Sequence, residues 1–308
     1  GGLVRISGDM AKERNAPLVS RDDVLLARHT ARSLEQQISD EQISALKRYE
    51  LFLNKGSAVG MVNGLAVLSN SNNMSEMSGM VMPLAAEVTP AQNRKSGRII
   101  ATGQLGNIAK EAVDNISAVI KKYTMTNLSD CDIHLQYVGA YNGVDGDSAS
   151  ITMATVIISA MENIPIRQDL AMTGSLNVRG HVLPIGGVTA KLEAAAEAGI
   201  KIALIPKDNG KDVMIDEKYY DMMEIYTVEN IRDVFEYAFV DCPMKQQYLD
   251  KLLPLTTDGK SSAVRLVPPK KVEYREPVPK EEPVVEETVI QDEVSVSDNQ
   301  VQGTPAPQ

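Results

Sequence analysis

The chain contains a serine and a lysine that each stand at the start of an expected helix. Ser148 follows two glycines and two aspartates in GVDGDSAS, residues 143–150, and a run of small and apolar residues comes after it. Free backbone N–H groups at a helix N-terminus attract negative charge, so a serine there lies where an oxyanion would be stabilised. The stretch therefore fits a nucleophile, and it equally fits a plain helix cap, which is the commoner role of such a serine.

Lys191 stands in the first turn of the second expected helix, within PIGGVTAKLEAA, residues 184–195. The helix dipole disfavours a cation at this end and burial disfavours it further, so both effects lower the pKa of a lysine from about 10.4. A lysine with a pKa of about 7–8 can accept the proton of a serine hydroxyl. Taken alone, however, a lysine on an alanine-rich helix is more often a solvated surface residue.

Other catalytic and ligand-binding patterns are weak in this sequence. His29, His134 and His181 are scattered, and none lies in a metalloprotease or esterase motif, so no local signature supports a Ser-His-Asp triad. Residues 130–134, DCDIH, have the spacing of metal ligands, but their alternation indicates the beginning of a strand. DGDS, residues 145–148, lacks the remaining ligands of an EF-hand, and no phosphate-binding loop of the P-loop type is present.

The composition restricts the class of protein. With 308 residues the chain is long enough for about two domains, and it begins Gly1-Gly2 without Met, which indicates a fragment of a longer protein. A net charge of −10 disfavours nucleic acid as the partner, and 4% aromatic residues without Trp disfavour a stacking surface. Cys131 and Cys242 form no C-x-x-C pair and no signal peptide is evident, so we expect reduced thiols in the cytosol. The longest apolar stretch, residues 151–161, is far shorter than the ~20 residues that a membrane span needs.

Helical patterns dominate the N-terminal part, residues 1–54. One helix is expected to begin after Ser20 as its cap, with Asp22 and Asp23 in the first turn where they suit the helix dipole. A second helix is expected to begin after Ser39. This part is too short to be independently stable.

Strand and helix patterns alternate from Lys55-Gly56 to about residue 240, which predicts one α+β or α/β domain. From about Pro254 the sequence is rich in Pro, Glu, Val and Lys without periodicity, so we expect a disordered tail. The expected elements are strands within 57–69, 80–90 and 96–104, a helix within 105–123, a strand at 131–138, a helix at 151–161, two strands around Arg179-Gly180, a helix at 189–199 closed by Gly199, strands at 200–209 and 220–229, and a last helix at 230–239.

The two chemical stretches together resemble a known family. GDSAS and AMTGSLNVRGHVLPIGGVTAKLEAAAEAGIKIALIPKDN, the latter residues 171–209, are similar to the proteolytic domain of Lon proteases, in its archaeal LonB variant. The similarity extends over about residues 56–240. The interval of 43 residues between Ser148 and Lys191 is the spacing of the catalytic pair in that family.

The resemblance implies roles for five residues of the proteolytic part. Ser148 would be the nucleophile and Lys191 its general base, and Thr173 would position the lysine. Asp145 matches an acidic position that can pair with the lysine, and Asp147 matches an acidic position directly before the nucleophile. Since a nearby carboxylate raises the pKa of a lysine, a pair of Asp145 with Lys191 would be a resting state that substrate or assembly must rearrange.

The resemblance also implies an organisation. We expect a remnant of an AAA+ α-helical subdomain at 1–54, an α+β, mixed-sheet serine peptidase domain at 55–253 and a disordered Pro/Glu-rich tail at 254–308. Arg5 lies near where such ATPase modules carry a nucleotide-sensing arginine. The full-length enzyme would use ATP and Mg, whereas this chain would need no cofactor and would hydrolyse peptides without unfolding proteins.

The partners implied by the resemblance are unfolded polypeptides and further copies in a homohexamer, with no nucleic acid. The expected location is the cytoplasm, at the cytoplasmic face of the membrane for the full-length protein, with membrane contact only through parts outside this chain. Two other interpretations remain. A ring-forming module without activity would use Ser148 as a helix cap and Lys191 as a solvated residue, and a Ser-Lys hydrolase of another specificity would cleave, for example, its own polyprotein.

Overall fold

A mixed sheet of eight strands forms the centre of the computed structural model. In spatial order the strands are β12 (Val264–Leu266), β11 (Glu224–Val228), β10 (Ile202–Pro206), β7 (Leu170–Met172), β2 (Met61–Leu68), β3 (Ser78–Pro90), β5 (Cys131–Tyr137) and β4 (Ile99–Thr102). The strands β11, β10, β7 and β2 run parallel, β3 is antiparallel to both β2 and β5, β4 is parallel to β5, and β12 is antiparallel to β11. The α+β class with a mixed sheet is therefore confirmed.

The structure describes only part of the chain. The helix expected after Ser39 and the chain beyond Pro268 lie outside the described residues, and the chain divides into the units Gly1–Pro268 and Pro269–Gln308. Within the described ranges no helix has both the length and the apolar character needed to cross a membrane. The described residues are 2–30, 41, 52–68, 78–92, 97–102, 106–124, 130–139, 145–255 and 261–268.

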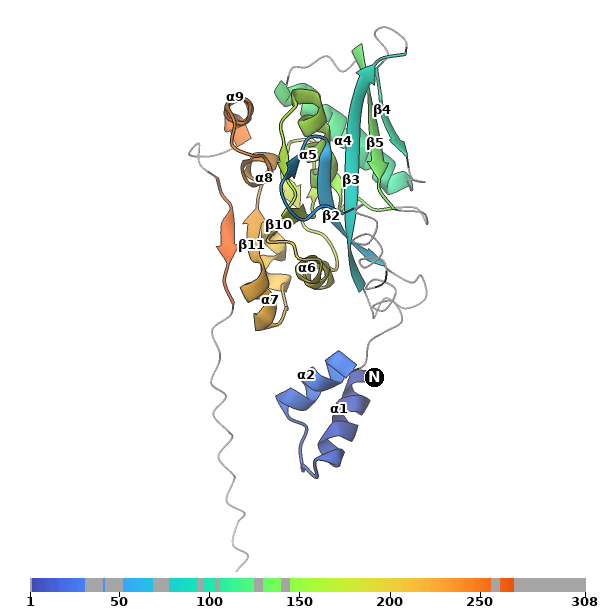
Figure 1. Cartoon of the computed structure of the whole chain (residues 1–308), viewed down its shortest axis with the longest axis vertical. Coiled ribbons are helices and arrows are strands. Elements are labelled where there is room, and N and C mark those ends of the chain that lie inside the picture. Colours follow the sequence, from blue (N-terminus) through green and yellow to red (C-terminus); the bar gives the residue numbers. More distant parts are fainter. Residues whose placement is uncertain are drawn as a thin grey trace, which may run out of the picture. The chain divides into compact units, whose positions relative to one another are not determined.

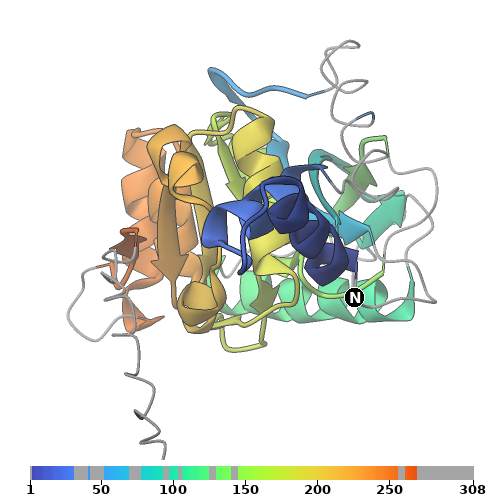
Figure 2. The same cartoon turned by 90° about the horizontal axis from the view of Figure 1, so that it is seen from below.

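Helices cover both faces of the sheet (Figure 1 and Figure 2). Alternate strand residues point to opposite faces, and accordingly Met82 belongs to one core cluster whereas its neighbour Val81 belongs to the other. The first cluster includes residues of α4 (Asn107–Thr124), α5 (Ser150–Glu162), α8 (Ile231–Ala238) and α9 (Pro243–Lys251). The second includes residues of α6 (Val188–Glu197) and α7 (Glu217–Met222).

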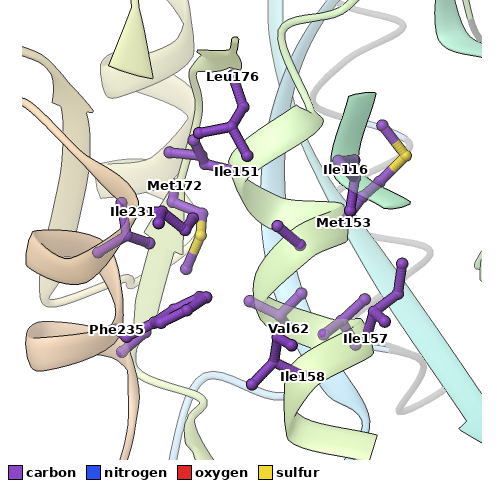
Figure 3. Close-up of a cluster of buried hydrophobic side chains, with 14 of the residues drawn as sticks. Val62, Ile116, Ile151, Met153, Ile157, Ile158, Met172, Leu176, Ile231 and Phe235 are labelled. Atoms are coloured by element: carbon purple, nitrogen blue, oxygen red, sulfur yellow. The ribbon is translucent and has the colours of Figure 1, made fainter. Parts of the chain in front are cut away.

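Helix α5 is surrounded by the core on all sides. Its first ten residues are all buried, and Ile151, Met153, Ile157 and Ile158 extend from it toward different neighbours, among them Phe235 of α8 (Figure 3). β-Branched residues disfavour an isolated helix slightly, but burial of this much apolar surface outweighs that preference. The expected helix at 151–161 is confirmed.

Two short antiparallel ribbons lie outside the main sheet: β1 (Ser57–Ala58) with β6 (Ile166–Arg167), and β8 (Ser175–Leu176) with β9 (Val182–Leu183). The second ribbon is the hairpin expected around Arg179-Gly180, and Gly180 has a φ of +89° in its turn. The stretch 169–187 supplies three strands and not two, because Leu170–Met172 joins the main sheet before the hairpin begins.

Most other expected elements are confirmed, among them α4, β5, β10 and the helix α6, which is followed by Gly199 in a left-handed conformation with φ +87°. Three expectations are corrected. Residues 220–222 belong to α7 and not to a strand, α9 follows the helix that was expected to be the last, and β12 lies beyond Pro254, where the tail was expected to begin. Residues 207–212 and 253–255 form 3₁₀ turns, named η2 and η3.

The N-terminal residues form α1 (Gly2–Glu13) and α2 (Arg21–Thr30). Ser20 caps α2 as expected: its Oγ accepts from the Asp23 N–H at 3.2 Å, and the Asp23 carboxylate accepts from the Ser20 N–H at 2.8 Å. Arg5 lies exposed in α1.

Candidate active site

Ser148 lies in the turn that leads into α5. The turn is closed by a 3.0 Å hydrogen bond from the Ser150 N–H to the Asp147 carbonyl. Ala149, not Ser148, is the N-cap residue of α5, and no side chain caps the helix. The Ser148 side chain is partly exposed, and its hydroxyl has no hydrogen-bond partner in the described part of the chain. The capping role considered for Ser148 is therefore not the one that the structure gives it.

The segment from Thr173 to Ser175, directly after β7, holds this turn in place. The Ser148 carbonyl accepts hydrogen bonds from the Gly174 N–H at 2.8 Å and from the Thr173 hydroxyl at 3.1 Å. The Gly174 carbonyl accepts in turn from the Ile151 N–H at 3.2 Å. A Cβ atom on Gly174 would lie 2.9 Å from the Val182 side chain, so this close approach favours glycine. Together these bonds fix the backbone of Ser148 relative to the sheet.

Lys191 is the largest fully buried side chain among the described residues, with 1% of its surface exposed. Its Nζ atom donates a 3.1 Å hydrogen bond to the hydroxyl of Thr173, which is itself fully buried. The single Thr173 proton goes to the Ser148 carbonyl, so the hydroxyl oxygen is left to accept from the lysine. A continuous chain of hydrogen bonds thus links Lys191 to the backbone of Ser148.

Burial changes the protonation of Lys191. The loss of hydration disfavours the ammonium form and lowers the lysine pKa from 10.5 to about 8, while the charge of Asp147 acts in the opposite direction and raises it. The interpretation of Lys191 as a solvated surface residue is therefore wrong. A lysine in this environment is neutral in a substantial fraction of molecules near pH 8.

Two contacts bring α6, and with it Lys191, close to the sheet. Gly79 of β3 lies directly under the first turn, where a Cβ atom would be 1.9 Å from the Ala190 carbonyl oxygen. Asn209 of η2 holds the loop before α6: its side-chain amide accepts from the Ile185 N–H at 2.8 Å and donates to the Ile185 carbonyl at 3.0 Å. The helix begins after Gly187, whose φ of +70° is a left-handed conformation.

The two aspartates of the DGDS turn, residues 145–148, have different surroundings. The Asp145 carboxylate accepts from its neighbour Gly146 N–H at 2.9 Å and from the Ala109 N–H at the start of α4 at 3.4 Å. No ion pair joins Asp145 to Lys191 in the described part of the chain, because the start of α4 holds this carboxylate. Asp147 is the acid that acts on Lys191, and its carboxylate accepts a 2.6 Å hydrogen bond from the Ser175 hydroxyl.

The structure does not bring a histidine to Ser148. His134 lies exposed on β5, where its Nε2 contacts the Thr89 hydroxyl at 3.2 Å, and His181 lies exposed directly before β9. His29 is in α2. No group of His, Cys, Asp and Glu residues among the described ones is arranged to hold a metal ion.

Sequence reasoning did not single out three residues that shape the site: Ser175, Gly79 and Asn209. Ser175 directly follows Thr173-Gly174, so its neighbourhood was a usable signal, and Asn209 ends the PKDN stretch after β10. No local pattern marks Gly79, because the atoms that exclude a side chain there come from a distant helix.

Comparison with known proteins assigns the chain to a family. Residues 35–241 match the family described as the Lon protease (S16) C-terminal proteolytic domain. Similar curated proteins include the archaeal Lon proteases of Methanothermobacter thermautotrophicus, 55% identical over 240 residues, and Halobacterium salinarum, 51% identical over 264 residues. A Lon protease of Rickettsia felis is 32% identical over 251 residues.

These matches cover 78%, 85% and 78% of this chain, but only 36%, 37% and 31% of the respective relatives, so the chain spans about a third of their length. The family model alone covers well over half of the chain. The chain therefore belongs to the family of Lon protease C-terminal proteolytic domains.

Proposed function

We propose that this chain is a serine endopeptidase in which Ser148 is the nucleophile and Lys191 is its general base. One observation carries the proposal: a fully buried lysine is linked through the Thr173 hydroxyl to the backbone of a serine whose own hydroxyl is unpaired in the described part of the chain. Family membership supports it, since the family is one of proteolytic domains.

The lowered lysine pKa supports the role of base. At pH 8 less than about 1% of an ordinary lysine is neutral, whereas about half of the Lys191 side chains would be neutral with a pKa of about 8. A base is most effective when its pKa lies near the working pH. The bond to Thr173 orients the amine, because one N–H is occupied and the lone pair is left for another group.

The proposed reaction is acyl transfer to Ser148. The neutral amine of Lys191 takes the hydroxyl proton while the serine Oγ bonds to the substrate carbonyl carbon, and the carbonyl electrons move to its oxygen. The ammonium of Lys191 then protonates the departing amine, which leaves an ester on Ser148. Water attacks this ester while Lys191 accepts a proton from it. The bond between the serine Oγ and the acyl carbon then breaks, Lys191 returns the proton to the serine oxygen, and the carboxylic product departs.

Backbone groups of the turn suit the oxyanion of both steps. The N–H groups of Ser148 and Ala149 donate to no acceptor in the described part of the chain. Removing one such donor from an oxyanion site typically costs about 100- to 1000-fold in rate. These available N–H donors support the assignment of the turn as the site where the oxyanion forms.

The wider function is part of the same proposal. Relatives about three times as long are named Lon proteases, and we infer that this chain is the proteolytic part of an ATP-dependent enzyme that degrades unfolded polypeptides as a cytoplasmic homohexamer. Residues 1–54 would then belong to the AAA+ module, with Arg5 near its nucleotide, and ATP and Mg would bind outside this chain. Peptide cleavage by this chain would need neither.

The test is cleavage of an unstructured peptide without ATP by the wild type, Ser148→Ala and Lys191→Ala. Loss of cleavage in both variants, with unchanged circular dichroism, supports the proposed dyad. If both variants cleave as fast as the wild type, the dyad is not catalytic, and the ring-forming module becomes the better interpretation. Profiling of the cleaved peptides distinguishes a general endopeptidase from an enzyme that cuts only one sequence of its own polyprotein.

A further inference from the structure

The acid next to the nucleophile lies close enough to act on Lys191 but does not pair with it. Asp147 is the charged group that raises the pKa of the buried amine, yet Nζ donates its hydrogen bond to Thr173, and no ion pair joins Lys191 to Asp147 among the described residues. A buried ammonium beside a carboxylate gains strongly from forming a pair. Something must therefore hold the carboxylate in its present place.

Ser175 is the residue that holds it. Its hydroxyl donates a 2.6 Å hydrogen bond to Oδ2 of Asp147, which is the length expected when the acceptor is a carboxylate. Ser175 is 5% exposed and begins β8, whose pairing with β9 fixes its backbone. The backbone of the donor is thus fixed by strand pairing, whereas the Asp147 side chain is exposed.

We propose that Ser175 is a positioning residue that keeps the Asp147 carboxylate away from Lys191, so that the lysine stays neutral. The inference rests on the proposed function for its catalytic meaning, but its structural part concerns only the three side chains. Without the Ser175 hydroxyl, the carboxylate would turn to Lys191 and favour the ammonium form, which cannot accept the serine proton.

The charged groups on the elements around α6 are not causes of the shifted Lys191 pKa. The elements packed against α6 include β2, β3, β10, η2 and α7, and β2 and β10 carry no charged residue. None of the charged groups on the other elements is among the causes of the lowered lysine pKa. These groups are Glu193 and Glu197 on α6 itself, Glu87 on β3, Lys207, Asp208, Lys211 and Asp212 on η2, and Glu217, Lys218 and Asp221 on α7.

The direct test is a titration of the Lys191 side chain by NMR in protein labelled with ¹³C-lysine, where the signal missing in Lys191→Met gives the assignment. We expect the Lys191 midpoint in Ser175→Ala to rise by about 1 pH unit, the lower end of the effect of a newly paired carboxylate. In the background of Asp147→Asn, Ser175→Ala should leave the midpoint unchanged. Ser175→Thr retains the hydroxyl and should titrate like the wild type.

Ser175→Cys keeps the test independent of cavity effects. Its thiol fills nearly the same space but is a weak donor, so the midpoint should rise in this variant too. An unchanged midpoint in Ser175→Ala and Ser175→Cys, both correctly folded by circular dichroism, would overturn the inference. The inference would also be overturned if Ser175→Ala raised the Lys191 midpoint equally in the wild-type and in the Asp147→Asn background, because the carboxylate would then play no part.

Peptide cleavage by the same variants separates this inference from the proposed function. In Ser175→Ala the rate should fall about tenfold at pH 7 and return to the wild-type value near pH 10, where the lysine is neutral in both proteins. If the NMR midpoint rises as expected but no protein cleaves peptide, the positioning role stands and the peptidase assignment fails. If cleavage depends on Lys191 and the midpoint does not move, the peptidase assignment stands and the role of Ser175 fails.

Discussion

The Nζ atom of Lys191 lies 3.1 Å from the hydroxyl oxygen of Thr173, and that hydroxyl donates at 3.1 Å to the carbonyl of Ser148. Ser148, in the turn before α5, and Lys191, on α6, are 43 positions apart in sequence and are thus connected through the residue that follows the central strand β7. The strand β7 is parallel to its neighbours β2 and β10, so its position is fixed from both sides. The geometry of the site follows from the rigidity of this strand.

Removal of the Thr173 hydroxyl should impair activity more than stability. Thr173→Val keeps the shape of the side chain but leaves both the Lys191 amine and the Ser148 carbonyl without this partner, and we expect kcat/KM to fall about 10- to 100-fold. Thr173→Ser retains the hydroxyl and should stay within a few-fold of the wild type. The measurement is peptide cleavage with a parallel thermal melt; equal activity of Thr173→Val and Thr173→Ser would exclude a role for the hydroxyl.

Lys191→Met should be inactive but more stable than the wild type at neutral pH. The folded protein binds the lysine proton less well than the unfolded chain, with a pKa of about 8 against 10.5, so burial of this side chain costs about 3 kcal/mol below pH 8. Methionine has no charge to desolvate and a similar length.

The sign of the pH dependence follows from the same pair of values. Between about pH 8 and 10.5 the unfolded state binds more protons, so the stability of the wild type rises with pH in this window. The advantage of Lys191→Met is therefore complete below pH 8 and vanishes above 10.5. Urea unfolding at pH 7 and pH 10.5 tests this. If Lys191→Met were less stable than the wild type at pH 7, burial of the lysine would not destabilise the folded protein, and the prediction would be wrong.

Gly79→Ala should damage the site from a distance. Its Cβ atom would lie 1.9 Å from the Ala190 carbonyl oxygen, and since this is backbone, either α6 or β3 must move. We expect a destabilisation of about 1–3 kcal/mol and loss of most peptide cleavage, because Lys191 follows Ala190. Gly186→Ala is the control, as no atom lies within 4 Å of its added Cβ. Thermal melts of both variants make the comparison, and equal melting temperatures would show that the close approach is unimportant.

The two aspartates of the turn should differ in their effect on the pH profile. Asp147→Asn removes the charge that raises the Lys191 pKa, so the midpoint of the cleavage profile should move to lower pH. Asp145→Asn removes a carboxylate that contacts the start of α4, and its midpoint should match that of the wild type. If the midpoint shifted in Asp145→Asn but not in Asp147→Asn, the result would support the pair of Asp145 with Lys191 that the sequence resemblance implied.

Local sequence patterns predicted most elements of the domain but not the contacts between them. The periodicity of residues 105–123 and 131–138 was sufficient for α4 and β5, because these elements carry their own apolar faces. The segment around β12 carries no such pattern. It is held by the buried Asp233 carboxylate, which accepts from the Ser261 hydroxyl at 2.9 Å and the Ser262 N–H at 3.0 Å. The tail boundary predicted at Pro254 was therefore too early. The contacts that hold this segment come from Asp233, about 30 positions earlier in the chain, so no local pattern could reveal them.

The site shows the same limit. Residue type, spacing and resemblance singled out Ser148, Lys191 and Thr173, and the structure brings these three together. The surroundings of Asp145 could not be predicted in this way, because the start of α4 that receives its carboxylate is more than 30 residues earlier in the chain.

The most direct test of the central claim is the rate of peptide cleavage without ATP from pH 6 to 10, for the wild type and Lys191→Ala. We expect the wild-type rate to rise with pH around a midpoint near 8 and then to level off, because the reaction needs the neutral lysine. In Lys191→Ala the rate should be at background throughout. Equal rates in the two proteins would contradict the account, since Lys191 could then not be the base that activates Ser148.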